Sequence, residues 1–175
     1  VYLYDMKDGA LLAALTGSQA GDRVGNNTLQ AVGDVRVLRS TLWNSNRGAV
    51  TVYDVVNGVN GVVGAANSLV GANAGDQVGS FGVQALGSSI AVRSPEFNGT
   101  RGAVTIAPAA SLRGTVGAGN SLVGANIGDR VGDNFFQSVG SGNFVLSSTH
   151  GGAGAVTFIN PASAPKGVVG AANSL

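Results

Sequence analysis

The stretch NSLVGANAGDQVG at residues 67–79 returns as NSLVGANIGDRVG at residues 120–132. A third copy begins at Asn173, so that Asn67, Asn120 and Asn173 are each 53 residues apart. Two shorter motifs keep nearly the same spacing. These are G-D-x-V-G at 21–25, 75–79 and 128–132, and G-A-V-T at 48–51, 102–105 and 154–157. A period near 53 residues sustained over three copies predicts a tandem-repeat architecture.

The composition favours short strands joined by tight turns. Glycine supplies 29 of the 175 residues, while charged residues make up only 11% of the chain. Apolar residues reach 44%, which is too high for a disordered low-complexity tract. Short runs of Val, Ile, Leu and Phe alternate with Gly, Asn and Ser, which is the pattern of an all-β protein. The length suffices for one domain with its own core.

Each period is expected to hold four strands. In the middle copy the predicted strands cover residues 80–86, 89–94, 102–107 and a part of 114–124. Residues 1–5 align with 50–54, a third strand, and residues 10–17 fill the place of a fourth strand. The single domain 1–175 therefore divides into a partial repeat 1–17, repeat 1 at 18–71, repeat 2 at 72–124 and repeat 3 at 125–175.

Four antiparallel strands in about 53 residues match the size of a propeller blade. We therefore expect a β-propeller-like array of three full blades and a half blade. An open stack of sheets or a β-solenoid array is the alternative, because propellers need ~4–8 blades to close. The unpaired edge strands would find partners if the chain is part of a longer array, or if they pair with other copies of the chain.

The Asp residues of the G-D-x-V-G motif are Asp22, Asp76 and Asp129. The Gly before each one can adopt a positive φ, and the carboxylate can accept N–H bonds of the turn. We therefore expect these three residues to cap turns rather than bind metal. No other pattern indicates a metal or a cofactor.

Two polar positions recur within the strands. Gln30, Gln84 and Gln137 occupy one place in strand one, and Ser40, Ser94 and Ser147 end strand two. The Gln side chains could bond to the backbone at blade junctions or present amides to a ligand. The structural role is the favoured interpretation.

The loops between strands two and three cover residues 41–47, 95–101 and 148–153 and vary most between copies. Trp43, Phe97 and His150 take one equivalent position in them. These rings could plug the space between blades or stack on sugars. His150 is the only histidine and cysteine is absent, so the chain offers no nucleophile or acid–base constellation, and we expect no enzymatic activity.

Charge and hydropathy argue against two classes of partner. The net charge is +1 and the charged residues are scattered singly, so nothing favours binding to nucleic acid. No apolar run approaches the ~18–20 residues of a membrane span, so membrane insertion is not expected.

Two resemblances follow from these motifs. The order GDQVGSFGVQAL, IAVRSP, GAVTIA resembles the FG-GAP blades of integrin-type propellers, with Val78-Gly79 in the place of Phe-Gly and Ser94-Pro95 in that of Ala-Pro. The calcium loop of many such blades is missing at 86–91. The whole chain is similar to repeats of filamentous-haemagglutinin-like secreted adhesins.

The resemblances imply an extracellular location at the bacterial cell surface and a structural or adhesive function. The expected partners are flanking repeats, other copies of the chain, and a glycan or a cell-surface protein.

Overall fold

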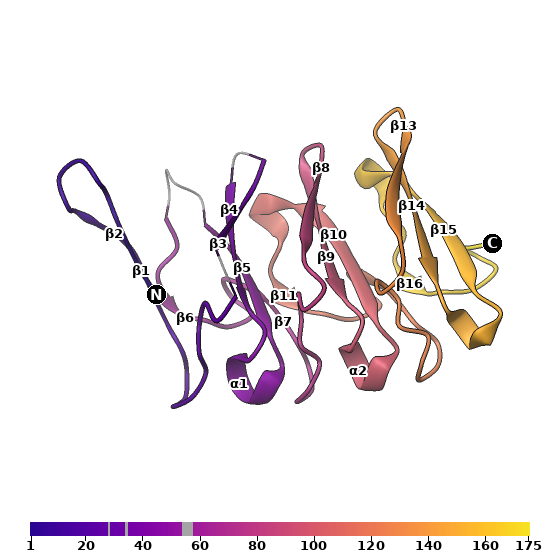
Figure 1. Ribbon diagram of the computed structural model, residues 1–175, viewed down its shortest axis with the longest axis horizontal. Helices are drawn as coiled ribbons and strands as arrows, with labels where there is room; N and C mark the ends of the chain where they lie inside the picture. The colour runs from indigo at the N-terminus through magenta and orange to yellow at the C-terminus, as the bar shows by residue number, and fades with distance from the viewer. Residues whose placement is uncertain (28, 34, 54–57) are drawn as a thin grey trace.

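The computed structural model describes residues 1–27, 29–33, 35–53 and 58–175. Its strands form four sheets that follow one another along the long axis of the molecule, with the two chain ends at opposite ends of the row (Figure 1). The predicted all-β repeat array is confirmed as an open stack of sheets. The described residues form no closed barrel or ring.

Each repeat contributes its strands to one sheet. Repeat 1 supplies β3 (Leu29–Val32), β4 (Val35–Ser40), β5 (Ala49–Tyr53) and β7 (Leu69–Val70). Repeat 2 supplies β8 (Val83–Leu86), β9 (Ser89–Ser94), β10 (Ala103–Pro108) and β12 (Ser121–Val123). Repeat 3 supplies β13 (Phe136–Gly140), β14 (Asn143–Ser148) and β15 (Ala155–Ile159). Neighbouring strands within each repeat pair antiparallel, and Leu86 pairs with Ser89 across a tight turn in which Gly87 has a φ of 61°.

The partial repeat forms the first sheet. Its strands β1 (Tyr2–Tyr4) and β2 (Leu11–Thr16) pair antiparallel. The same pairing joins β5 to β7 in repeat 1. The pairing agrees with the alignment of residues 1–17 to a third and a fourth strand.

A short strand of each repeat crosses to the preceding sheet. These strands, which we call clasp strands, are β6 (Gly61–Val62), β11 (Gly114–Thr115) and β16 (Gly167–Val168). They pair parallel with β2, β7 and β12 respectively. The segment 114–124 thus holds two strands where one was predicted, because β11 joins repeat 1 while β12 completes repeat 2. The sheets of repeats 1 and 2 thereby gain a fifth, parallel strand.

The predicted loops between strands two and three form single irregular turns. They contain α1 (Trp43–Asn46), α2 (Phe97–Thr100) and η2 (His150–Gly152). Asn44, Ser45, Asn98 and Gly99 have left-handed backbone conformations, so α1 and α2 are not regular helices. We call these segments the outer turns. Two further short 3₁₀ turns, η1 (Ala109–Ser111) and η3 (Pro161–Ser163), precede clasp strands.

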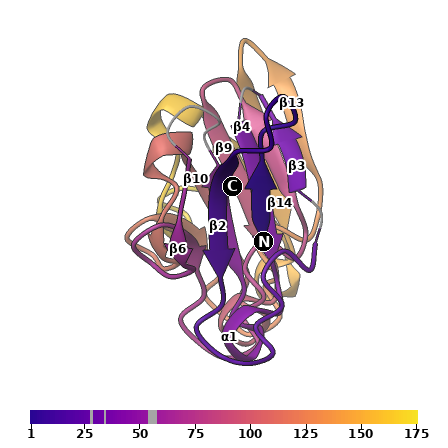
Figure 2. The same ribbon diagram turned by 90° about the vertical axis from the view of Figure 1, so that its left-hand side faces the viewer.

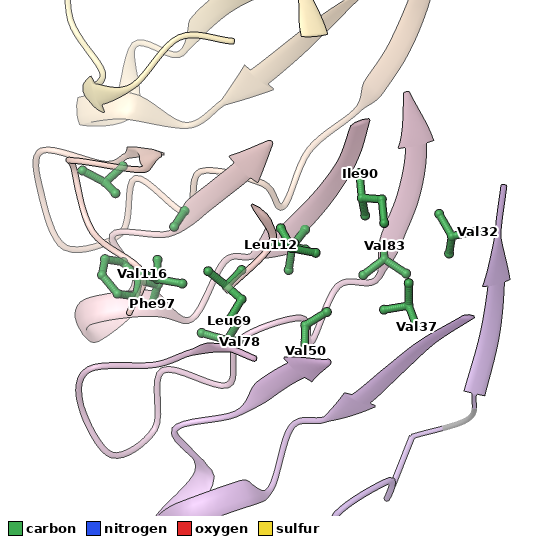
Figure 3. Packing of buried hydrophobic residues seen from close by; sticks show 13 residues of the cluster. Val32, Val37, Val50, Leu69, Val78, Val83, Ile90, Phe97, Leu112 and Val116 are labelled. Carbon is green, nitrogen blue, oxygen red and sulfur yellow. The ribbon is translucent and has the colours of Figure 1, made fainter. Parts of the chain in front are cut away.

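The hydrophobic core lies between sheets. Val37 and Val50 of repeat 1 pack with Val83 and Ile90 of repeat 2, as Figure 3 shows. A second cluster joins repeats 2 and 3, and a third joins the partial repeat to repeat 1. Each sheet therefore buries its apolar side chains only against its neighbours, as expected of a repeat array.

This arrangement predicts that a core substitution in one repeat weakens a junction. Leu69 and Leu122 are fully buried at equivalent positions. We expect Leu69→Ala and Leu122→Ala each to lower the free energy of unfolding by about 2–5 kcal/mol, because each leaves a cavity. Urea unfolding followed by circular dichroism measures the loss. The exposed Leu29→Ala is the matched control, and equal effects at Leu29 and Leu122 would contradict the core assignment.

Candidate functional site at the repeat junctions

The G-D-x-V-G motifs form three tight turns that we call the seam turns. Gly75 has a φ of 85°, and Gln77, which follows Asp76, has a φ of 44°. The seam turns at Asp22 and Asp129 have the same two left-handed positions. Glycine adopts the first of these at no steric cost, which explains why the motif begins with Gly.

Each seam-turn carboxylate is buried and joins two segments of its own repeat. Asp76 Oδ2 accepts a hydrogen bond of 2.8 Å from the Asn73 N–H, and Oδ1 accepts one of 2.8 Å from the Asn98 N–H in the outer turn. Asp22 accepts equivalent bonds from Gln19 and Asn44, and Asp129 from Asn126 and Gly151. The three residues predicted to cap turns therefore also hold the outer turns in place.

The seam turn simultaneously bonds to the preceding repeat. The Gln77 and Val78 N–H groups donate to the carbonyls of Asn46 and Arg47, at 2.9 and 3.0 Å. The Arg130 and Val131 N–H groups donate in the same way to Thr100 and Arg101. The seam turns at Asp76 and Asp129 consequently lie between the outer turns of two successive repeats.

The Gly of G-A-V-T is required by this close approach. A Cβ atom on Gly48 would lie 2.3 Å from the Val78 nitrogen, and one on Gly102 would lie 2.1 Å from the Val131 nitrogen. Both glycines also have positive φ values, so no other residue fits without displacing the seam turn.

Hydrogen bonding sets the ionisation of two of these carboxylates. Burial alone would raise the pKa of Asp22, but hydrogen bonds from the Gln19, Asn44 and Ser18 groups outweigh it and hold the pKa below the ordinary value. For Asp129, burial likewise opposes ionisation, and bonds from Asn126, Gly151 and His150 lower the pKa. Both groups are therefore charged at neutral pH and satisfied by N–H donors.

A polar network that sequence reasoning missed connects each clasp strand to its own repeat. Asn67 Nδ2 donates to the Val62 carbonyl at 3.1 Å, and Ser68 Oγ donates to Asn67 Oδ1 at 3.0 Å. Ser68 Oγ also lies 2.7 Å from Thr51 Oγ1. Equivalent networks surround Asn120 and Asn173. The invariant spacing of the three Asn residues was the available signal for this role.

Two arginines of each of repeats 1 and 2 bond to the next repeat, and one of each pair reaches its seam turn. Arg39 Nη1 donates to the Gly79 carbonyl at 3.0 Å, and Arg93 Nε donates to the Gly132 carbonyl at 2.7 Å. Arg47 and Arg101 donate to the carbonyls of Ala72 and Ala125. In repeat 3 the corresponding positions are Ser147 and Ala153.

The predicted aromatic position lies at the start of each outer turn. Trp43 and Phe97 are only 5% and 6% exposed and pack in the cores between sheets. So little exposed area leaves neither ring a free face on which a sugar could stack. His150 is half-buried, and its Nδ1 lies 3.1 Å from Asp129 Oδ2.

The other repeated polar residues take different environments. Gln30 Nε2 donates to the Val83 carbonyl of repeat 2 at 3.4 Å, whereas Gln84 is half-buried and Gln137 is exposed. Ser40 and Ser94 end strand two and accept bonds from seam-turn N–H groups. In repeat 3 the equivalent residue is Ser148, which pairs with Ala155, so the prediction of Ser147 was wrong by one residue. An additional residue between strands one and two of repeat 3 causes this shift, since the pairing of β13 with β14 is irregular between Ser138 and Gly140.

The described residues contain no group of three or more His, Cys, Asp or Glu side chains arranged to hold a metal ion. Within the same part of the chain, no helix has the length and apolar character needed to cross a membrane.

These features define a tandem β-sheet repeat protein whose units are joined by seam turns and clasp strands. A family model described as "Repeat of unknown function (DUF5650)" matches residues 36–80, 91–133 and 138–175. The chain belongs to this repeat family. No curated protein and no solved structure matches the chain.

The seam-turn geometry predicts that Asp76 is essential for a stable junction. Asp76→Ala leaves the N–H groups of Asn73 and Asn98 without their acceptor. Because a hydrogen bond to a charged group contributes ~1.5–3 kcal/mol, we expect a loss of about 3 kcal/mol in the free energy of unfolding. Asp8→Ala removes one exposed local bond and should change stability by less than about 0.5 kcal/mol. Similar losses in the two variants would refute the junction role.

The lowered pKa values predict loss of stability in acid. Since the pKa of Asp22 and Asp129 lies below 3.8 in the folded chain, their contribution is complete above that pH and is lost as pH falls through the folded pKa. The Tm should be nearly constant from about pH 7 to 5 and fall steeply below about pH 4. The double variant Asp22→Asn/Asp129→Asn should have a lower Tm at pH 7 than the unmodified chain. Its Tm should also decrease less steeply as the pH falls. Asp8→Asn is the control. If the Tm of the double variant falls in acid as steeply as that of the control, the prediction is wrong.

Proposed function

We propose that this chain is a non-enzymatic structural repeat domain of a large extracellular bacterial surface or matrix protein. The observation that carries the proposal is that the hydrophobic cores and the seam-turn backbone hydrogen bonds lie between repeats. Successive sheets therefore behave as one continuous body, which can extend a surface protein or space other modules.

The junction contacts support mechanical continuity along the array. Consecutive repeats are linked by clasp-strand pairing, by seam-turn backbone bonds and by an apolar core. Separating two repeats requires breaking all three together, because they involve the same strands and turns. A stiff extended array is suited to a structural function.

The location and the adhesive part of the proposal rest on resemblance. The sequence motifs of the repeats resemble those of filamentous-haemagglutinin-like adhesins and of FG-GAP propeller blades. The absence of cysteine from the sequence is compatible with a bacterial surface protein.

A second candidate is ligand binding by the outer turns, which lie along one edge of the array (Figure 1). Their tips are polar and exposed at Ser45, Asn46, Asn98 and Gly99. A carbohydrate or a protein would contact these tips rather than the buried rings of Trp43 and Phe97. Loss of glycan-array binding in Asn98→Ala, with unchanged folding, would favour this candidate.

An in-phase deletion tests the structural function. Removing residues 72–124 joins Gly71 to Ala125 and preserves the repeat phase. We expect the shortened chain to fold and its longest dimension to fall by about 10 Å, the usual spacing of packed sheets, in small-angle X-ray scattering. In the source bacterium, antibodies against the chain should label intact cells that express either the unmodified protein or the shortened one.

The control is the out-of-phase deletion of residues 72–97, which removes strands one and two of repeat 2 but keeps its remaining strands. This variant should not fold, because the seam turn of repeat 2 is deleted and the remaining core faces no longer match. Equal behaviour of the two deletions, or labelling of permeabilised cells only, would refute the proposal.

A further inference from the structure

A hollow of about 400 Å³ lies at the junction between repeats 2 and 3, and we call it the junction hollow. It is lined by residues of η1 in repeat 2 and of η3 in repeat 3. Figure 1 shows these two turns as short coils, salmon and yellow, at the edge of the array opposite the outer turns. In Figure 2 both coils lie on the side of the molecule that carries β6. The volume is within the range of small-molecule sites.

The junction hollow combines an apolar floor with a polar rim. Its buried lining residues include Leu69, Ile106 and Leu112, which are at most 7% exposed. The exposed polar residues that line it are Ser111, Arg113, Ser163 and Lys166. A concave apolar surface with a few convergent polar groups is the usual form of a ligand site.

The rim carries two cations that no carboxylate neutralises. Arg113 and Lys166 take equivalent positions, each one residue before a clasp strand. Within the described ranges, neither side chain takes part in a salt bridge, and no Asp or Glu lines the hollow. Two positive charges beside a concave surface favour an anionic ligand.

The backbone of the two turns favours a carboxylate over a phosphate. The Leu112 and Arg113 N–H groups donate to carbonyls within η1, and the Ala162 N–H donates to Asn160 Oδ1 at 3.0 Å. These N–H groups are therefore not available to form the backbone nest that commonly binds phosphate. A carboxylate needs only the paired donors of a guanidinium, which Arg113 supplies.

The floor and the hydroxyl groups favour a sugar as the carrier of that carboxylate. A sugar ring has C–H groups that can pack against Leu112 and Ile106, and hydroxyls that can bond to Ser111 and Ser163. The two serine side chains form no hydrogen bond within the described part of the chain, so both remain available as donors and acceptors.

A similar hollow at the preceding junction shows that further repeats do not fill such a space. It measures about 380 Å³, lies between repeats 1 and 2, and persists although repeat 3 follows. Its lining includes Ala110, which corresponds to Ser163. The space is thus a property of the junction, while the hydroxyl of Ser163 is particular to the junction hollow.

We propose that the junction hollow binds a sugar that carries a carboxylate, such as a unit of an acidic polysaccharide. Arg113 and Lys166 hold the carboxylate, Ser111 and Ser163 bond to ring hydroxyls, and the ring packs on Leu112. Because repeats 2 and 3 both line the hollow, the bound sugar also stabilises their junction. The inference goes beyond the proposed structural function and does not rest on it.

Isothermal titration calorimetry with galacturonate and its trimer tests the proposal. The unmodified chain should bind at least one of the two, and the tighter ligand shows whether a free sugar acid or a chain is preferred. Arg113→Gln/Lys166→Gln should weaken binding by about tenfold or more, because hydrogen bonds to charged groups are lost. The matched control Lys7→Gln/Arg23→Gln removes the same charge at exposed positions outside the hollow and should bind as the unmodified chain does.

Circular dichroism establishes that the variants fold, and Ser163→Ala, which should weaken binding several-fold, replaces the double variant if that chain does not. Absence of binding to both sugars, or equal losses in the two double variants, would overturn the proposal. So would equal binding of the galacturonate methyl ester or of a triglutamate peptide, because the carboxylate or the sugar would then be unnecessary. Asn98→Ala should retain full affinity, and a loss there would move the site to the outer turns.

Cell labelling does not depend on this hollow, so its outcome judges the structural function separately.

Discussion

The buried carboxylate of the seam turn is the constraint on which the rest of the structure depends. A charged group can be buried only if hydrogen bonds replace its water, and Asp76 obtains them from Asn73 and Asn98. These donors are in place only when the seam turn and the outer turn of that repeat have both formed. The N–H groups that follow Asp76 meanwhile bond to the preceding repeat. One short motif thus ties the local turn, the repeat and its neighbour together.

The position of the cores extends this dependence along the chain. Because each sheet buries its apolar side chains against the sheets on either side, an isolated repeat would expose both faces. The clasp strands strengthen the coupling, since β11 belongs to repeat 2 in sequence and to the sheet of repeat 1 in space. Stability is therefore shared between neighbours.

Much of the junction could be predicted from repetition. The turn role of the three Asp residues and the equivalence of Trp43, Phe97 and His150 follow from aligned copies, and the structure places these residues accordingly. The contacts of Arg39 and Arg93 with the next seam turn could not be predicted. Those arginines lie some 40 residues from their acceptors, and an exposed position in a strand is equally compatible with a solvated side chain.

The sequence by itself determined the period, the all-β character and three of the four strands of the middle repeat, because strand and turn propensities act over a few neighbouring residues. Only the tertiary structure decided that Gly114 and Thr115 pair with the preceding sheet, since two residues carry too little local information to choose a partner. It also decided that the sheets stack in an open row, because that arrangement depends on how whole sheet faces pack.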